Sequence, residues 1–160
     1  MIELKLSDKD YSIRSNWNEV TYDGYCKIIE AKDKQFVERL SVYAGIELPV
    51  IERLNFKQLI LLCDLLEFMD DFESVNAFAI GYESELTIGE QEYWKIEKAK
   101  QLLKGNLNPI TVAGEIIELY TSDKDGNGGV KIGDKPITEA IGMAAFFLSH
   151  CQSSLSDSKG

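Results

Sequence analysis

The chain begins with apolar and polar residues in strict alternation, which is the period-two pattern of a β-strand. The alternation covers residues 2–6, and apolar residues return at Tyr11 and Ile13 after the turn-forming residues 7–10. This arrangement predicts an N-terminal β-hairpin. Thr21 follows, and its hydroxyl can accept a hydrogen bond from a free first-turn amide, so it predicts a helix that starts at about residue 22.

Most of the remaining chain has apolar residues at helical spacing, which predicts five or six helices. Gly45 and Gly105 stand where two of them should end. Thr87 and Glu90 have the spacing of a capping box near the start of another. The predicted ranges are 22–31, 33–44, 55–70, 88–103, 109–121 and 136–149. The helix over 55–70 has the widest apolar stripe, so we expect it to be the central core helix.

Two short apolar segments, 77–82 and 130–132, predict additional strands. The fold class is therefore α+β and mainly helical. We expect one globular domain over 1–152 and a flexible tail over 153–160, which has little apolar content. Each half of the chain also pairs a strand-like segment with a capped helix, so the domain is compatible with a duplication of units 1–74 and 75–152.

Composition and charge narrow the class of protein. The chain has 160 residues, the usual length of one domain, and its net charge is −10. Residues 1–75 carry 9 basic and 15 acidic residues, and residues 76–160 carry 8 and 12, so the negative charge runs through both halves. Such a charge repels polyanions, which disfavours direct nucleic-acid binding.

The apolar stretches, the N-terminus and the cysteines indicate where in the cell the protein is located. No apolar stretch approaches the roughly 20 residues needed to cross a bilayer, and the N-terminus lacks the pattern of a signal peptide. We therefore expect no membrane association and a cytoplasmic location. The cysteines are odd in number and far apart, which predicts reduced, buried thiols. They are Cys26, Cys63 and Cys151.

The segment 123–134 is the sharpest candidate for a ligand site. Calcium is bound by about six to eight oxygen atoms, which a twelve-residue loop can supply from alternate positions around a glycine turn. The candidate ligands are Asp123, Asp125, Asn127 and Asp134. Asp, Asn and Gly also form ordinary turns, so the sequence leaves both a calcium-stabilised binding module and a plain glycine-rich turn open.

Catalytic signatures are sparse. His150 is the only histidine and lies near the end of the chain that we expect to fray. We therefore expect neither a histidine metal triad nor a Ser-His-Asp relay. Neither the glycine pattern of a dinucleotide site nor that of a phosphate-binding loop is present. Acid pairs such as Asp70 and Asp71 leave a small hydrolase as an alternative. The balance favours a protein that is not an enzyme and has no cofactor.

Two kinds of surface could bind a partner protein. Glu67, Asp70 and Asp71 cluster where the dipole of the predicted helix is already negative, which suits a basic partner segment. Aromatic residues near helix starts are the second kind, because aromatic side chains are enriched in protein interfaces. The candidates of this kind are Trp17, Tyr22 and Trp94.

A loose pattern joins several of these features. It runs from Trp17 through Thr21, Leu40, Gly45 and Leu65 and ends with the sequence Glu-Leu-Thr-Ile-Gly-Glu over 85–90, so it spans about two thirds of the chain. The pattern resembles small acidic proteins encoded among the head and tail morphogenesis genes of tailed bacteriophages. The resemblance implies a virion structural component or an assembly factor such as a tail assembly chaperone. It also implies virion or assembly proteins as partners, and a location in the host cytoplasm or the virion.

Overall fold

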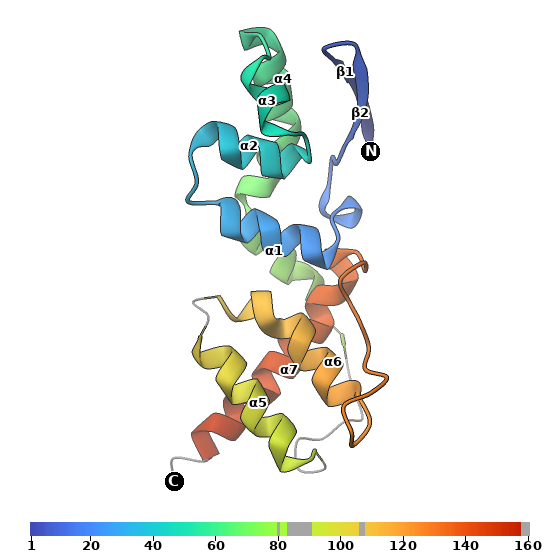
Figure 1. Ribbon diagram of the computed structural model, residues 1–160, viewed down its shortest axis with the longest axis vertical. Helices are drawn as coiled ribbons and strands as arrows, with labels where there is room; N and C mark the ends of the chain where they lie inside the picture. Colours follow the sequence, from blue (N-terminus) through green and yellow to red (C-terminus); the bar gives the residue numbers. More distant parts are fainter. Residues whose placement is uncertain (80, 83–90, 106–107, 158–160) are drawn as a thin grey trace.

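The computed structural model describes residues 1–79, 81–82, 91–105 and 108–157, with side-chain surroundings as far as Cys151. The molecule is elongated (Figure 1). The hairpin and helices α2 to α4 form one end, α5 to α7 form the other, and α1 crosses between them. The strands are β1 (Ile2–Leu6) and β2 (Lys9–Ile13), and the α-helices are α1 (Tyr22–Ala31), α2 (Phe36–Ala44), α3 (Leu48–Glu52), α4 (Phe56–Leu66), α5 (Tyr93–Lys104), α6 (Ala113–Thr121) and α7 (Ile137–Asp157). Short 3-10 helices are η1 (Trp17–Glu19), η2 (Glu67–Asp70), η3 (Phe72–Ala79) and η5 (Pro109–Val112).

The N-terminal hairpin is confirmed. β1 and β2 pair antiparallel with Ile2 opposite Ile13. Ser7 and Asp8 form the turn with φ values of 48° and 66°, and two left-handed residues give a turn whose twist matches that of the strands. Leu6 and Ile13 are fully buried, so the hairpin has one face on the core. With the helices that follow, it confirms an α+β fold that is mainly helical.

Helix α1 links the two ends of the molecule. Thr21 accepts a hydrogen bond from the Gly24 amide at 3.1 Å, so the expected cap is present. The amides of Tyr22 and Asp23 donate to the carbonyls of Lys135 and Gly133, at 2.9 and 3.1 Å. These bonds satisfy first-turn donors that a helix leaves free, and they tie the start of α1 to the segment before α7.

The core is centred on α1, α6 and α7 rather than on the helix over 55–70. Ile116, Ile117 and Ile137 are completely buried, and α6 packs along α7. Helix α4 instead lies at one end of the molecule (Figure 1) and contacts α2 on one side. Its wide apolar stripe is only partly covered, because Phe56 is 77% exposed and Ile60 is 46% exposed. The expectation of a central core helix is therefore wrong.

The expected additional strands are absent from the described residues. Residues 72–79 form η3, which packs against α7, and residues 130–132 run without a strand partner. A strand is stabilised by neighbouring strands, and an apolar segment that meets a helix can be buried as a helix instead. The proposed second unit therefore begins with a helix, not a strand. Its capping box at Thr87 and Glu90 lies outside the described residues.

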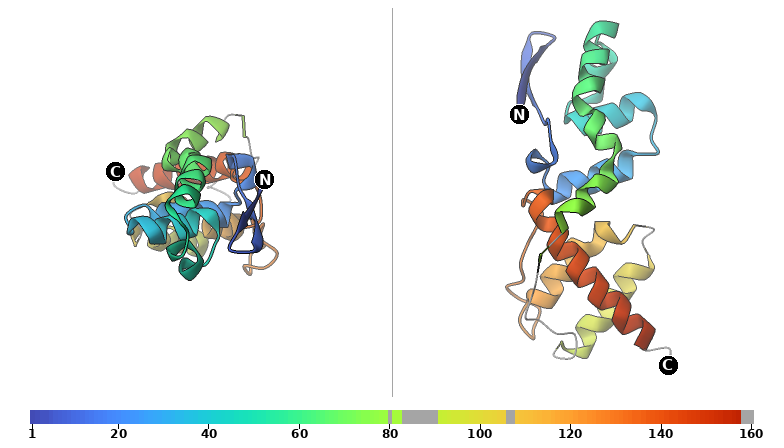
Figure 2. Two further views of the ribbon diagram at one scale, coloured as in Figure 1. Left: turned by 90° about the horizontal axis from the view of Figure 1, so that it is seen from above. Right: turned by 180° about the vertical axis from the view of Figure 1, so that it is seen from behind.

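Helix α7 is longer than its apolar pattern predicts. It runs from Ile137 to Asp157, so the backbone of 153–157 is helical where we expected a frayed tail. Figure 2 shows it from behind as it leads away from α1 to the C-terminal end of the molecule. Within the described part of the chain, no helix has the length and apolar character required to cross a membrane.

Candidate functional site

The most unusual surface lies on α4 and the start of α2. Phe56, Leu59, Ile60 and Cys63 are three or four residues apart, so they lie along one face of α4. Phe36 of α2 lines the same groove as Cys63 and is 49% exposed. We call these five residues the apolar stripe. Of its four residues on α4, Phe56 and Ile60 are exposed, while Leu59 and Cys63 are half-buried.

A groove of about 100 Å³ separates α2 from α4 beside this stripe. Burial raises the pKa of Tyr43 in the groove, the nearby Asp70 carboxylate raises it further, and Arg39 opposes both. Burial likewise raises the pKa of Cys63, with the same two charges acting on it in the same directions. The charges of Asp70 and Arg39 therefore both influence the ionisation of these two side chains in the groove. The lining residues are Phe36, Arg39, Leu40, Tyr43, Cys63, Leu66 and Asp70.

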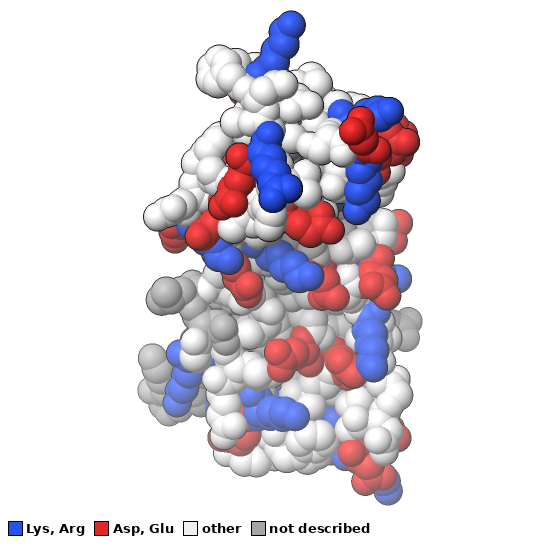
Figure 3. Space-filling view, turned by 45° about the horizontal axis from the view of Figure 1, so that its top comes forward, with Lys and Arg blue, Asp and Glu red and all other residues white. Residues whose placement is uncertain are grey.

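A cluster of carboxylates runs from the C-terminal end of α4 through η2 to the start of η3. We call Asp64, Glu67, Asp70, Asp71 and Glu73 the acidic rim, and all five are exposed. Residues 56–73 of the sequence contain one basic residue, Lys57. No ion pair between described residues involves a member of the rim. Figure 3 shows charges of both signs interspersed over one face of the molecule. The run 64–73, in contrast, contains acidic residues and no basic residue.

The predicted aromatic contacts are divided between core and surface. Trp17 is only 7% exposed, its Nε1 donates to Ser74 Oγ at 3.0 Å, and its ring meets Tyr25 and Phe68 edge-on. Tyr22 is also buried. Both aromatics fix α1 against its neighbours, so the expectation that they bind a partner is wrong.

Trp94 is the predicted aromatic that does reach the surface. It lies on α5 and is 42% exposed. Figure 1 places α5 at the opposite end of the molecule from α4. The structure therefore does not bring Trp94 together with Glu67, Asp70 and Asp71, which all lie in or next to η2.

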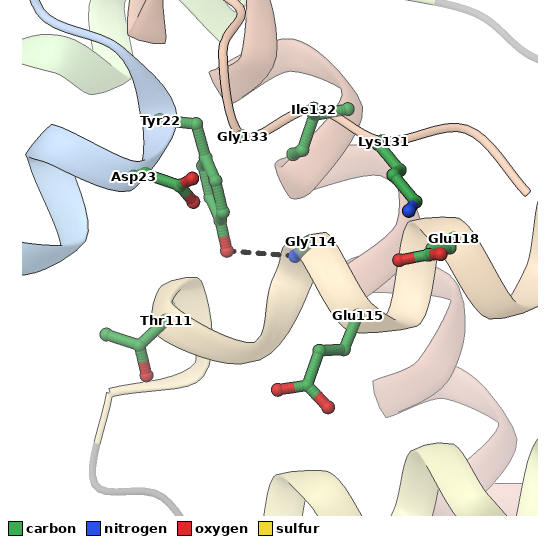
Figure 4. A pocket seen from close by; sticks show the side chains of 9 residues that line it. All are labelled: Tyr22, Asp23, Thr111, Gly114, Glu115, Glu118, Lys131, Ile132 and Gly133. Atoms are coloured by element: carbon green, nitrogen blue, oxygen red, sulfur yellow. Dashed lines mark hydrogen bonds between the residues drawn. The ribbon is translucent and has the colours of Figure 1, made fainter.

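A second cavity, of about 330 Å³, lies between α1, α6 and the segment before α7. Tyr22 lines this cavity, and its hydroxyl accepts a hydrogen bond from the Gly114 amide at 2.8 Å (Figure 4). The same hydroxyl donates to the Ile110 carbonyl at 2.6 Å. Asp23, Glu115, Glu118 and Lys131 also line the cavity. Among the residues with described positions, no three His, Cys, Asp or Glu side chains are placed to hold a metal ion.

The predicted calcium ligands are not brought together. Asp123 follows the C-terminal end of α6, and its Oδ1 accepts from the amides of Asp125 and Asn127, both at 2.9 Å. These amide hydrogen bonds, with that of Asn127 the strongest, lower the pKa of Asp123. The chain then runs back along α6, so that Asp134 lies beside the start of α1. Helix α6 is about 13 Å long at 1.5 Å per residue, which separates the two ends of the loop.

Pattern analysis missed one buried charged residue. Lys95 of α5 is 2% exposed, and its Nζ donates to the Ser122 carbonyl at 2.8 Å. It also lies 3.3 Å from Glu92 Oε2. Ser122 ends α6, so the ammonium stabilises free carbonyl groups and the negative end of that helix dipole. The three-residue spacing of Glu92 and Lys95 is compatible with an ion pair. It did not single out Lys95, because α5 contains several other lysines.

The three cysteines are free thiols, as predicted, but the expectation that all three are buried is wrong. Cys151 is buried, whereas Cys26 and Cys63 are partly exposed. Burial raises the pKa of Cys26 to about 11. None of the three therefore has the lowered pKa that marks a reactive thiolate.

The chain was compared with known proteins by family, by sequence and by structure. No protein-family model, curated protein or solved structure matches it. A function must therefore be inferred from the geometry of the α4 surface.

Proposed function

We propose that this protein binds other proteins as a non-enzymatic component of a larger assembly. The observation that carries the proposal is the apolar stripe, above all Phe56 and Ile60, which stand in solvent at one end of the molecule. A monomeric protein rarely leaves a contiguous apolar patch uncovered unless the patch is an interaction site.

The energetic argument concerns what these side chains could contribute. Burying a side chain such as Phe or Ile is worth about 1.5–3 kcal/mol. Phe56 is 77% exposed and Ile60 is 46% exposed, so most of this free energy is left unused at Phe56 and part of it at Ile60. Helix α4 does not need apolar residues at these positions, since Lys, Glu and Gln form helices nearly as well as Leu. Leu62 and Leu66 already supply its buried face. The exposed surface of Phe56 and Ile60 therefore remains available to stabilise a complex.

The resemblance to bacteriophage morphogenesis proteins supports a particular kind of assembly. We propose a virion structural component, or an assembly factor such as a tail assembly chaperone, acting in the cytoplasm of the infected cell. Its partners are other virion or assembly proteins. The net charge of −10 supports protein partners over direct contact with nucleic acid.

Complex formation tests this proposal. The protein is produced together with each protein encoded next to it, and the mass of the product is measured by size-exclusion chromatography with light scattering. We expect a stoichiometric complex with at least one neighbour, and its loss in the double variant Phe56→Gln, Ile60→Gln. Tyr93→Gln is the matched control, because Tyr93 is 72% exposed but lies on α5.

Two results would contradict the proposal. One is a protein that remains alone with every neighbour. The other is a complex that survives the double variant but is lost in Tyr93→Gln, which would move the interaction site to α5.

A further inference from the structure

Resting on the proposed function, we infer that the groove between α2 and α4 binds one amphipathic helix of a different, basic protein. The apolar face of that helix lies along the apolar stripe, and its Lys or Arg side chains meet the acidic rim. Three features of the described residues lead to this partner: the spacing of the stripe, the pairing of the local backbone, and the distribution of charge.

The spacing of the stripe matches a helix. Phe56, Ile60 and Cys63 follow one another at about one turn each, and the groove continues the surface to Phe36 on α2. Two packed helices with a groove between them accept a third helix whose apolar residues recur at i, i+3, i+4 and i+7. Cys63 and Phe36 line the groove itself, and the exposed Phe56 and Ile60 extend the apolar surface along α4 toward its N-terminal end.

The backbone of this surface argues against a strand as the partner. An extended segment binds by pairing with free amide and carbonyl groups at a sheet edge. Helices α2 and α4 use these groups internally, and Asn55 and Gln58 cap the start of α4 reciprocally. The free edges among the described residues belong to β1 and β2 of the hairpin. A partner strand would therefore bind at the hairpin, while the α4 surface offers side chains only.

Charge determines the chemistry of the partner. The acidic rim lies around the C-terminal end of α4, where the helix dipole adds to its negative potential. Its carboxylates form no ion pair with described residues, so they can pair with incoming cations. A second copy of this chain also carries a net charge of −10, and like charges across an interface are costly. The occupant is therefore a basic segment of another protein.

A defined peptide tests the inference. The probe is a blocked peptide of about 18 residues, roughly five helical turns, with Leu at the i, i+3, i+4, i+7 positions and Lys on the flanking positions. It is titrated into the ¹⁵N-labelled full chain while amide chemical shifts are followed. One control peptide has the same composition with Leu at every second position. The other has Glu in place of Lys.

We expect the helical Lys peptide to shift amides of α2, α4 and η2. Affinity should fall roughly tenfold or more in Phe56→Gln, Ile60→Gln. It should also fall in Asp64→Asn, Glu67→Gln, together with a weaker dependence on salt. Tyr93→Gln should bind as the wild type does.

Several results would overturn the inference. They are absence of binding, equal binding of either control peptide, or shifts centred on the acidic cavity at Asp23, Glu115 and Glu118. A dimer that dissociates in Phe56→Gln, Ile60→Gln would assign the surface to a second copy. If the peptide fails while a neighbour-encoded protein still requires Phe56 and Ile60 for its complex, the proposed function stands and only the helical, basic partner is wrong. If neither binds, both are wrong.

Discussion

Lys95 offers a sharp test of the fold around α5 and α6. The side chain is almost fully buried, and its ammonium donates to the Ser122 carbonyl at the end of α6. The substitution Lys95→Met removes the ammonium and keeps an unbranched side chain of similar length. It therefore isolates the polar contribution without opening a large cavity.

Three contributions set the size of the effect. A carbonyl that loses its donor in a partly buried place costs about 1–3 kcal/mol. The Glu92 partner is 39% exposed, so solvent screens the ion pair and its contribution is small. Removing a buried charge relieves its desolvation, which acts in the opposite direction. We expect the free energy of unfolding to fall by about 1–3 kcal/mol, with Tm falling about 2–4 °C for each kcal/mol.

Urea unfolding followed by circular dichroism measures this difference. Lys98→Met is the matched control, because Lys98 lies on the same helix but is exposed, and its substitution should change stability by less than about 0.5 kcal/mol. If Lys95→Met is as stable as Lys98→Met, the ammonium does not stabilise the end of α6, and our account of this contact is refuted.

Three further predictions follow from the same structure. A Cβ at Gly129 would collide with the Glu118 carbonyl oxygen, so Gly129→Ala should destabilise the protein by about 1–3 kcal/mol in urea unfolding; Gly105→Ala, with open space around it, should not. Millimolar calcium should shift Tm by less than about one degree in calorimetry, because the ends of loop 123–134 lie apart; a larger shift would show a site. The pKa of Cys26 is raised to about 11, so iodoacetamide should label it slowly at neutral pH and faster as pH rises toward that value; rapid labelling at pH 7, detected by mass spectrometry, would contradict the raised pKa.

Local signals in the sequence predicted much of the fold. The alternation of residues 2–6 placed the hairpin, Thr21 placed the start of α1, and Gly45 adopts the left-handed conformation that ends α2. Each of these features depends on residues close together in the chain. Turns and helix caps can therefore be predicted from the sequence before any tertiary contact is known.

Features that depend on distant contacts were not predictable in the same way. Residues 72–79 became η3 because they pack on α7, and periodicity could not distinguish a short buried strand from a short helix. The loop over 123–134 has the composition of a calcium site, but its path along α6 separates Asp123 from Asp134. Lys95 is buried because the end of α6 reaches it, which no pattern within α5 reveals.

The sequence pointed to the acidic residues of the candidate site but not to its exposed apolar residues. Glu67, Asp70 and Asp71 were expected to bind a basic partner; Asp70 lines the groove, and Glu67 and Asp71 lie in or next to η2 with it. Phe56 and Ile60 were expected in the core and lie at the surface. Apolar periodicity identifies which face of a helix is apolar, but whether that face is covered depends on the rest of the fold.

Photo-crosslinking in the cells that make the protein tests the central claim most directly. A photoreactive phenylalanine analogue replaces Ile60 on α4 in one sample and Tyr93 on α5 in the other, and crosslinked segments are identified by mass spectrometry. The account predicts a crosslink from position 60 to a basic helical segment of a different protein, and none to it from position 93. Crosslinks from position 93 alone, or from position 60 to another copy of this chain, would contradict it.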